Sequence, residues 1–299
     1  MTDPSIPNMS SSQRERLAYI DFRLYFFGEI GRPDLIKRFG VAPAGATRDL
    51  ALYRKCAPQN ISFDGSNKIY RISQNFSPLF EHSLPRVLSV LVKGFGYGID
   101  ALTEPLLPFE SPTSLSHPKI NVLAALCRAI KANQPVAIRY YSMSSGETER
   151  IIVPFALIDT GLRWHVRAFD RKHGEFRDFV LTRIESPILI DEQSLMHERS
   201  DKDIQWTRIV ELDLVPHPRL IRPEIIKMDY GMTGDSLYIK ARAAVVGYML
   251  QCWSVDCSSD HHLTDEQYRL WLSDPLVLYG VQSATLAPGY QAPASIKNQ

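Results

Sequence analysis

The chain has 299 residues, of which 44% are hydrophobic and 22% charged, as is typical of a globular protein with two or three domains. Its formal net charge is +1, so overall charge alone does not indicate a nucleic-acid partner. It has no run of about 18 apolar residues and no apolar segment near the N-terminus, so neither a membrane span nor a signal peptide is expected.

Three helices are predicted after a polar, Ser- and Pro-rich arm over residues 1–12. The first covers residues 13–30, where apolar side chains recur at helical spacing. The second covers residues 32–39 and is ended by Gly40. The third covers residues 44–56, after a tight link, and is followed by a proline.

Residues 60–73 predict a β-hairpin, because apolar and polar residues alternate around the turn pair Asp64-Gly65. Helix, short helix, tight turn, helix and hairpin in this order form a winged helix-turn-helix. Between Arg32 and Lys55 there are six basic residues and two acidic ones, the local cationic surface expected of a DNA-reading module. The alternative is a small α/β packing unit with no DNA role.

The exposed start of the third helix carries the main candidates for base contact, because this part of a recognition helix meets the major groove. Thr47 and Arg48 lie there. Asp49 is expected either to orient an arginine or to cap the helix locally. Each charged residue taken singly can also be an ordinary solvated side chain. The predicted DNA-binding residues are Arg32, Thr47, Arg48, Arg54, Lys55, Lys68 and Tyr70.

The middle of the chain connects the N-terminal module to the next one. Residues 76–107 are mostly apolar and predict a helix followed by a loop. Residues 108–118 are rich in Pro and Ser and are the clearest linker in the chain. A helix with one apolar face is predicted over residues 119–133.

Residues 135–187 contain four strand-like runs separated by turn-rich gaps, with many arginines and several aromatic residues along them. Guanidinium groups are planar forks of donors that suit phosphate or carboxylate groups. Tyr141 and Trp164 are able to stack on a base. The unit contains no nucleophile–base pair and no obvious metal cage, so ligand sensing is expected rather than catalysis.

Period-two alternation divides the third run into two faces. One face contains Trp164, Val166 and Ala168, and the other contains Arg163, His165 and Arg167. Trp164 is either a stacking residue or part of the core, and His165 is expected to line a face rather than to bind a metal. Arg139 and Arg167 are either ligand contacts or structural ion-pair partners.

The C-terminal third predicts a small α/β module. Residues 191–205 are charged and are expected to be a second linker. The predicted elements are a strand over 206–214, a helix over 222–230, a strand over 236–243, a helix over 244–253 and one further strand or helix between 262 and 279. Residues 284–299 are expected to form a disordered tail.

The chain has four cysteines without the spacing of a disulfide framework, which favours a reducing, cytoplasmic location. Between Cys252 and His262 the spacing C-x4-C-x3-H-H invites a zinc interpretation, but it is not that of a standard zinc finger. A buried free Cys252 is the simpler interpretation. No metal or other cofactor is predicted.

The β-unit resembles the WYL domain. The matching segments are Tyr141-Ser142, Arg150, Pro154, the run RWHVRA over 163–168, Arg177 and the run LTRI over 181–184. The Trp-Tyr-Leu triplet that names the domain is Trp164-His165-Val166 in this chain, so the ligand preferences of standard WYL proteins do not transfer directly. The form GLRWHVRAFD followed by FRDFVLTRI is similar to the CapW and BrxR regulators of the phage-defence systems CBASS and BREX.

This resemblance implies an α+β multidomain protein. It implies an N-terminal winged helix-turn-helix with a connecting helix over residues 1–107, a central Sm-like β-barrel (the WYL domain) over 118–190, and a small α/β extension (WCX) that mediates dimerisation over 205–283. It also implies a homodimeric repressor that binds an inverted repeat in double-stranded promoter DNA and responds to an unknown nucleic-acid or nucleotide-like ligand. The residues that match ligand-facing positions are Tyr141, Ser142, Arg150, Trp164, His165, Arg177 and Arg183; the motif does not decide which line a pocket and which brace the barrel.

Two other interpretations remain open from the sequence. One is an RNA- or single-stranded-DNA-binding protein in which the Sm-like unit is the main effector. The other is a nucleotide-processing enzyme, which the lack of paired carboxylates near a metal-binding motif disfavours. No catalytic residues are predicted.

Overall fold

The computed structural model describes residues 9–93, 107–108, 110, 112 and 115–293. The chain divides into two compact units, Met1–Pro112 and Thr113–Gln299, and the division falls inside the predicted linker over 108–118. Along these described parts, no helix is both long and apolar enough to cross a membrane.

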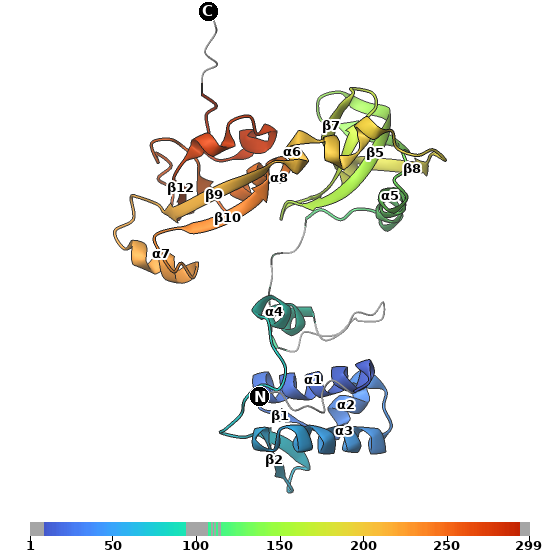
Figure 1. Ribbon diagram of the computed structural model, residues 1–299, viewed down its shortest axis with the longest axis vertical. Helices are drawn as coiled ribbons and strands as arrows, with labels where there is room; N and C mark the ends of the chain where they lie inside the picture. The colour runs from blue at the N-terminus through green and yellow to red at the C-terminus, as the bar shows by residue number, and fades with distance from the viewer. Residues whose placement is uncertain (1–8, 94–106, 109, 111, 113–114, 294–299) are drawn as a thin grey trace, which may run out of the picture. The chain divides into compact units, whose positions relative to one another are not determined.

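The first unit begins with three helices packed on one another (Figure 1). They are α1 (Ser11–Phe27), α2 (Arg32–Phe39) and α3 (Pro43–Cys56). Helix α2 has the predicted bounds, because Pro33 in its first turn favours the helix start and Gly40 ends it with a φ of 62°. Helix α1 ends three residues earlier than predicted, because Gly28 adopts a φ of 76° and the chain then enters a strand.

The hairpin predicted over residues 60–73 is the wing of this unit. It is formed by β2 (Ile61–Asp64) and β3 (Ile69–Ile72) after a 3₁₀ turn, η2 (Pro58–Asn60), and β1 (Glu29–Ile30) adds a third strand in the order β1-β3-β2. Buried apolar residues from all three helices form the core of the unit, including Leu17, Leu35 and Leu50. The arrangement confirms the predicted winged helix-turn-helix. Helix α4 (Leu84–Lys93) follows, and the loop predicted after it falls mainly on residues outside the described ones.

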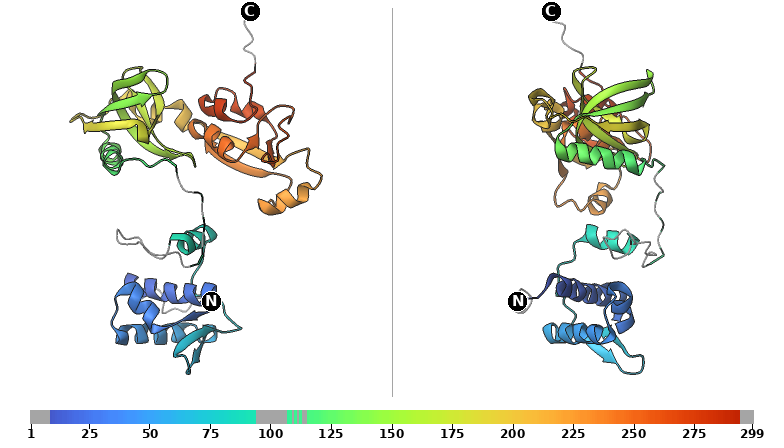
Figure 2. Two further views of the ribbon diagram at one scale, coloured as in Figure 1. Left: turned by 180° about the vertical axis from the view of Figure 1, so that it is seen from behind. Right: turned by 90° about the vertical axis from the view of Figure 1, so that its right-hand side faces the viewer.

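The second unit opens with α5 (Ile120–Ala132), which covers one face of a strongly curved five-stranded sheet (Figure 2). The strands are β4 (Val136–Ser142), β5 (Gly146–Asp159), β6 (Trp164–Asp170), β7 (Glu175–Val180) and β8 (Ile184–Leu189), with η3 (Leu181–Arg183) between the last two. The sheet is antiparallel with the order β7-β6-β5-β4-β8. The sequence predicted four of these strands and missed β8, which continues through Ser186-Pro187.

Residues 191–205 are not a loose linker, so the prediction for this segment is wrong. They form η4 (Met196–Glu198), η5 (Ser200–Lys202) and the start of α6 (Ile204–Thr207), and both Glu198 and Asp203 are buried. Their carboxylates pair with Arg171 and Arg167 of the five-stranded sheet and its turn. The segment is charged because it neutralises arginines of its neighbour.

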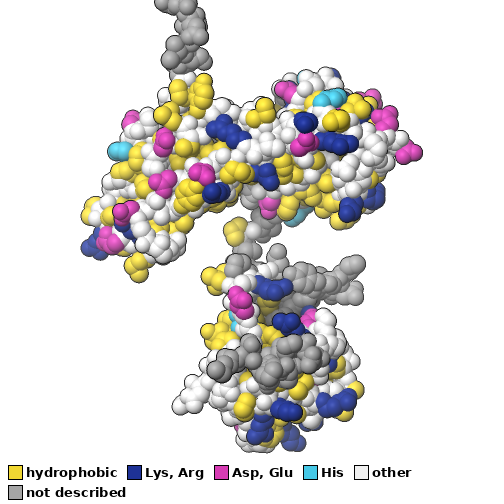
Figure 3. Space-filling model, viewed as in Figure 1, with side chains coloured by type: hydrophobic (Ala, Val, Ile, Leu, Met, Phe, Trp, Pro, Cys, Tyr) yellow, Lys and Arg dark blue, Asp and Glu magenta, His cyan; other side chains and the backbone are white. Residues whose placement is uncertain are grey.

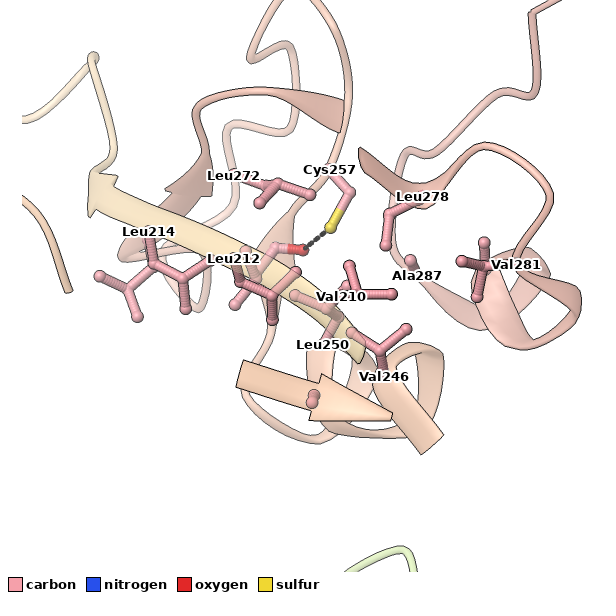
Figure 4. Close-up of a cluster of buried hydrophobic side chains, with 14 of the residues drawn as sticks. Val210, Leu212, Leu214, Val246, Leu250, Cys257, Leu272, Leu278, Val281 and Ala287 are labelled. Atoms are coloured by element: carbon pink, nitrogen blue, oxygen red, sulfur yellow. Dashed lines mark hydrogen bonds between the residues drawn. The ribbon is translucent and has the colours of Figure 1, made fainter. Parts of the chain in front are cut away.

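The C-terminal part is a four-stranded sheet with one main helix. Its elements are β9 (Ile209–Pro216), α7 (Pro223–Asp229), β10 (Leu237–Arg242), α8 (Ala243–Cys252), β11 (Val255–Asp256), β12 (Leu270–Leu272) and η6 (Pro275–Leu278), and the strand order is β10-β9-β12-β11. Leu212 and Leu214 of β9, Val246 and Leu250 of α8, and Cys257 meet in its core (Figure 4). This confirms the predicted small α/β extension.

The core of this domain extends beyond residue 283, so the tail predicted from residue 284 is wrong over residues 284–290. The 3₁₀ segment η7 (Gln282–Leu286) packs on α8, and Ala284, Ala287 and Tyr290 join the core. Gly247 permits this contact, because a Cβ at that position would overlap the backbone of Ser283. Residues 294–299 of the predicted tail lie outside the described residues.

Candidate DNA-binding and ligand-sensing sites

Helix α3 has one buried and one exposed face. Ala46, Asp49, Leu50 and Tyr53 are buried at the spacing of one helical face. The opposite face is exposed and consists of Ala44, Thr47, Arg48, Ala51, Arg54 and Lys55. Dark-blue basic side chains gather over this helix and the wing in the space-filling view (Figure 3).

The predicted residues of α3 are available to an outside partner. Arg48, Arg54 and Lys55 make no hydrogen bond or ion pair with another described side chain, and Thr47 only bonds back to the carbonyl of Pro43 at 3.0 Å. The small side chains of Ala44 and Ala51 between them leave the helix surface flat. This face therefore combines unpaired cations with close access to the backbone, as entry into a major groove requires.

Asp49 orients an arginine, one of the two roles predicted for it. Its carboxylate accepts two hydrogen bonds from Arg16 of α1, at 2.6 and 3.3 Å. The pair is largely buried and ties the recognition helix to α1.

A second buried carboxylate, Asp21 of α1, also fixes α3. It accepts hydrogen bonds from the Tyr53 hydroxyl at 2.5 Å, from the amides of Leu79 and Phe80 at 3.0 and 3.3 Å, and from His82 at 2.8 Å. Burial and the Asp21 carboxylate raise the pKa of Tyr53, so its hydroxyl remains a donor. The recognition helix is thereby connected to the segment that leads into α4.

The remaining predicted DNA contacts are more scattered. Arg32 is exposed at the first residue of α2, and Lys68 is exposed in the wing turn with a φ of 54°. Tyr70 is half-buried and packs on Phe63, with ring centroids 4.9 Å apart. Phe63 is the exposed aromatic of the wing, and its place in the alternation of the hairpin could have singled it out.

In the five-stranded sheet, Arg150 is a structural brace. Its guanidinium is buried, with Nη1 2.6 Å from the carboxylate of Asp170 and 3.0 Å from Nδ1 of His173, while Nε donates to Thr148. Burial acts to raise the pKa of Asp170, but hydrogen bonds from His173, the Lys172 amide and Arg150 outweigh it and lower that pKa. Arg150 therefore neutralises a buried charge.

The other predicted ligand residues do not meet in one pocket. The strand registers place Arg177 on the same face as Arg150, half-exposed and paired with Glu175, whereas Tyr141 lies on the opposite face with its hydroxyl 3.4 Å from Glu185. Ser142 closes β4 and bonds Ser144 at 3.0 Å. The set therefore divides between two faces of the sheet.

Trp164, His165 and Arg183 differ in how far each is buried. Trp164 is 39% exposed, so the core interpretation is wrong for it. His165 is buried and its Nδ1 has no hydrogen-bond partner among the described residues. Burial lowers the pKa of His165, so the ring is neutral near pH 7. Arg183 is half-exposed and makes no hydrogen bond to another described residue.

A buried junction between this sheet and the C-terminal domain was not predicted from the sequence. Arg167 of β6 bonds Asp203 at 2.7 and 3.1 Å and Asp178 of β7 at 3.0 Å. Tyr248 of α8 donates to Asp178 at 3.1 Å, and its ring lies 5.3 Å from that of His165. The available signal was the acidic residues of 191–205, which directly follow an arginine-rich unit.

A groove of about 700 Å³ lies on the outer face of β4, β5 and β8. Apolar side chains, including Ile151 and Ile188, line it together with Arg139, Arg171 and Lys172. Arg139 and Arg171 are held by glutamates, so Lys172 is the unpaired cation of the three. A groove of this composition is able to accept an anionic ligand with an apolar part.

Three segments of the chain match known families. Residues 12–92 match the family described as "BrxR transcriptional regulator winged helix-turn-helix domain", residues 121–189 match "WYL domain", and residues 209–278 match "BrxR transcriptional regulator, C-terminal dimerization domain". The three matches follow the three structural regions described above.

Curated relatives resemble the chain over most of its length. It is 32% identical over 253 residues to the DNA-binding transcriptional repressor CapW of Escherichia coli (strain KTE188), covering 80% of this chain and 81% of the relative. It is 31% identical over 254 residues to CapW of Pseudomonas aeruginosa, with coverages of 80% and 81%. A solved structure, the proteasome accessory factor B/C of Arthrobacter aurescens, aligns at a TM-score of 0.27 and 17% identity, covering 80% of this chain and 44% of that one.

Proposed function

Because the chain belongs to the CapW family of DNA-binding transcriptional repressors, with BrxR-type winged-helix and dimerization domains around a WYL domain, we propose that it represses transcription by binding promoter DNA as a homodimer. The observation that carries this proposal is the exposed face of α3, where three cations lie unpaired on a helix whose other face is fixed in the core.

Each part of the DNA-binding unit has a role in this proposal. Thr47 and Arg48, near the start of α3, read base edges, while Arg54 and Lys55 at its end bind phosphates. Arg32 and Lys68 add phosphate contacts on either side, and the wing contributes Tyr70 and its neighbour Phe63. Two such units in a dimer read an inverted repeat, since the two-fold symmetry of the protein is repeated in its operator.

The WYL domain is proposed to be the ligand sensor. The accessible members of the predicted set, Tyr141, Ser142, Trp164, Arg177 and Arg183, are the candidate contacts for a nucleic-acid or nucleotide-like ligand. Because Tyr141 and Arg177 lie on opposite faces of the sheet, one small ligand would contact only part of this set. Arg150 and His165 support the site from buried positions. Ligand binding would alter operator affinity because the sheet is joined to the dimerization domain through Arg167 and Tyr248.

The resemblance to CapW and BrxR supports the further proposal that the repressed operon encodes a phage-defence system. The curated relatives are repressors, and we propose no enzymatic activity.

A gel shift with the DNA upstream of the chain's own gene tests this function. The expected result is a specific complex of two chains per site that weakens as salt is raised, because phosphate contacts release counterions. Equal affinity for the upstream DNA and for a scrambled duplex would contradict the proposal.

A further inference from the structure

The C-terminal domain carries an apolar stripe that its own core does not use. Helix α7 exposes Ile225 and Met228, at 46% and 80% of their surface, and the bend before it exposes Ile221, at 95%. The spacing of three residues places Ile225 and Met228 on the same side of α7, and Ile221 lies two residues before the helix begins. An exposed patch of neighbouring apolar side chains is typical of a protein–protein interaction site.

The opposite side of α7 anchors it. Ile226 is buried and packs into the core with β9, so the helix is held while its apolar stripe points away from that core. Lys227 bonds Asp235 at 2.6 Å, which fixes the loop after the helix. Figure 1 shows α7 beyond the ends of β9 and β10. The apolar stripe is therefore held on the surface of the domain by the buried Ile226 and the Lys227–Asp235 contact.

The charges beside the stripe favour a second copy of this chain as the occupant. Arg222 and Asp229 lie at opposite ends of α7, both are exposed, and neither bonds another described side chain. In a two-fold contact between antiparallel helices, Arg222 of each copy lies beside Asp229 of the other. The same register brings Ile225 near its own counterpart and Ile221 near Tyr230, which is also exposed.

The location agrees with this occupant, because residues 209–278 match a dimerization domain and α7 lies within them. We propose that the α7 helices of two protomers pack antiparallel across the two-fold axis of the dimer, with Ile221, Ile225 and Met228 as the apolar centre of the contact. This inference rests on the proposed homodimer and names the surface that forms it.

Light scattering after gel filtration of the full chain tests the contact. We expect the Ile225→Glu/Met228→Glu variant to weaken dimerisation by about 30-fold or more, as the loss of an interface hot spot does. The matched control is Leu276→Glu on η6, where the side chain is 64% exposed in the same domain, and it should remain dimeric. Circular dichroism should show the same helix content in all three proteins.

Cross-linking provides the second test. Ile225→Cys, in a chain with Cys127 and Cys252 replaced by Ser, should form a disulfide-linked dimer on mild oxidation, whereas Leu276→Cys in the same background should not. The α7 contact alone would be overturned if the wild-type chain is a dimer, the Ile225→Glu/Met228→Glu variant is equally dimeric, and Ile225→Cys forms no cross-link. A monomeric wild-type chain would overturn the homodimer, and the α7 contact with it.

Discussion

Arg167 holds Asp203 through two hydrogen bonds of 2.7 and 3.1 Å, across 36 residues of sequence. Both side chains are almost fully buried, so the pair fastens the WYL sheet to the segment that leads into the dimerization domain. Removing one member leaves the other as a buried, unpaired charge, which typically costs about 3–5 kcal/mol.

We therefore expect Arg167→Met to lower the free energy of unfolding by about 3–5 kcal/mol in urea denaturation. Adding Asp203→Asn should recover part of this loss, because the amide removes the charge and keeps the N-cap of α6. Arg163→Ala, at an exposed position in the turn before β6, should change stability by less than about 0.5 kcal/mol. A similar small effect of Arg167→Met would show that the junction is not a stabilising contact.

Arg183 and Arg150 should differ sharply when each is replaced by Ala. Arg183→Ala should leave folding and operator binding intact and remove induction of a reporter operon during phage challenge, because its guanidinium is not paired with a described residue. Arg150→Ala should instead destabilise the chain, since Asp170 would be left buried without its partner. Normal induction in Arg183→Ala would remove this residue from the ligand site.

Asp170 makes stability depend on pH. Its pKa is lowered in the folded chain, so its contribution is complete above the unfolded pKa of about 3.9 and disappears as pH falls through the folded value. Asp170→Asn should therefore be much less stable than wild type at pH 7, and the difference should shrink progressively below pH 4. Urea unfolding at a series of pH values measures this, and a difference that is independent of pH would contradict it.

Asp21 should be necessary for the position of the recognition helix. Asp21→Asn places an amide donor against several existing donors, and we expect a loss of about 2–3 kcal/mol in the winged-helix unit. Tyr53→Phe removes one of the four bonds and should cost about half as much. Hydrogen exchange should show loss of protection in α3 and in residues 77–82 for Asp21→Asn, and unchanged protection there would argue against the network.

The N-terminal unit was predictable because its boundaries are local. Gly40 and the Asp64-Gly65 pair end or turn the chain by their own backbone preferences, and α2 and the wing follow directly. The segment 191–205 was misinterpreted because a charged run resembles a linker until its partners are known. Glu198 and Asp203 are buried only because arginines about 30 residues earlier reach them.

The predicted ligand-contact residues also depend on partners that are distant in sequence. Alternation placed Trp164 and His165 on opposite faces, but whether each face is covered depends on the domain that packs there, so the exposure of Trp164 was not predictable. The motif identified Arg150 as a ligand-facing position, yet its contact with Asp170 depends on the register between β5 and β6. The residue types predicted which side chains are able to bind a ligand. Contacts between strands and between domains decide which of those side chains a ligand can reach.

The exposed face of α3 is tested most directly by the salt dependence of operator binding, measured by fluorescence anisotropy with wild type and with Arg48→Ala/Arg54→Ala. The control is Arg71→Ala on the wing, whose guanidinium is already paired with Glu29 and Asp64. We predict that the α3 variant loses specific binding and that the slope of log K against log salt falls by about 1 for each phosphate contact removed, while the control stays close to wild type. Wild-type affinity and slope in Arg48→Ala/Arg54→Ala would contradict the account.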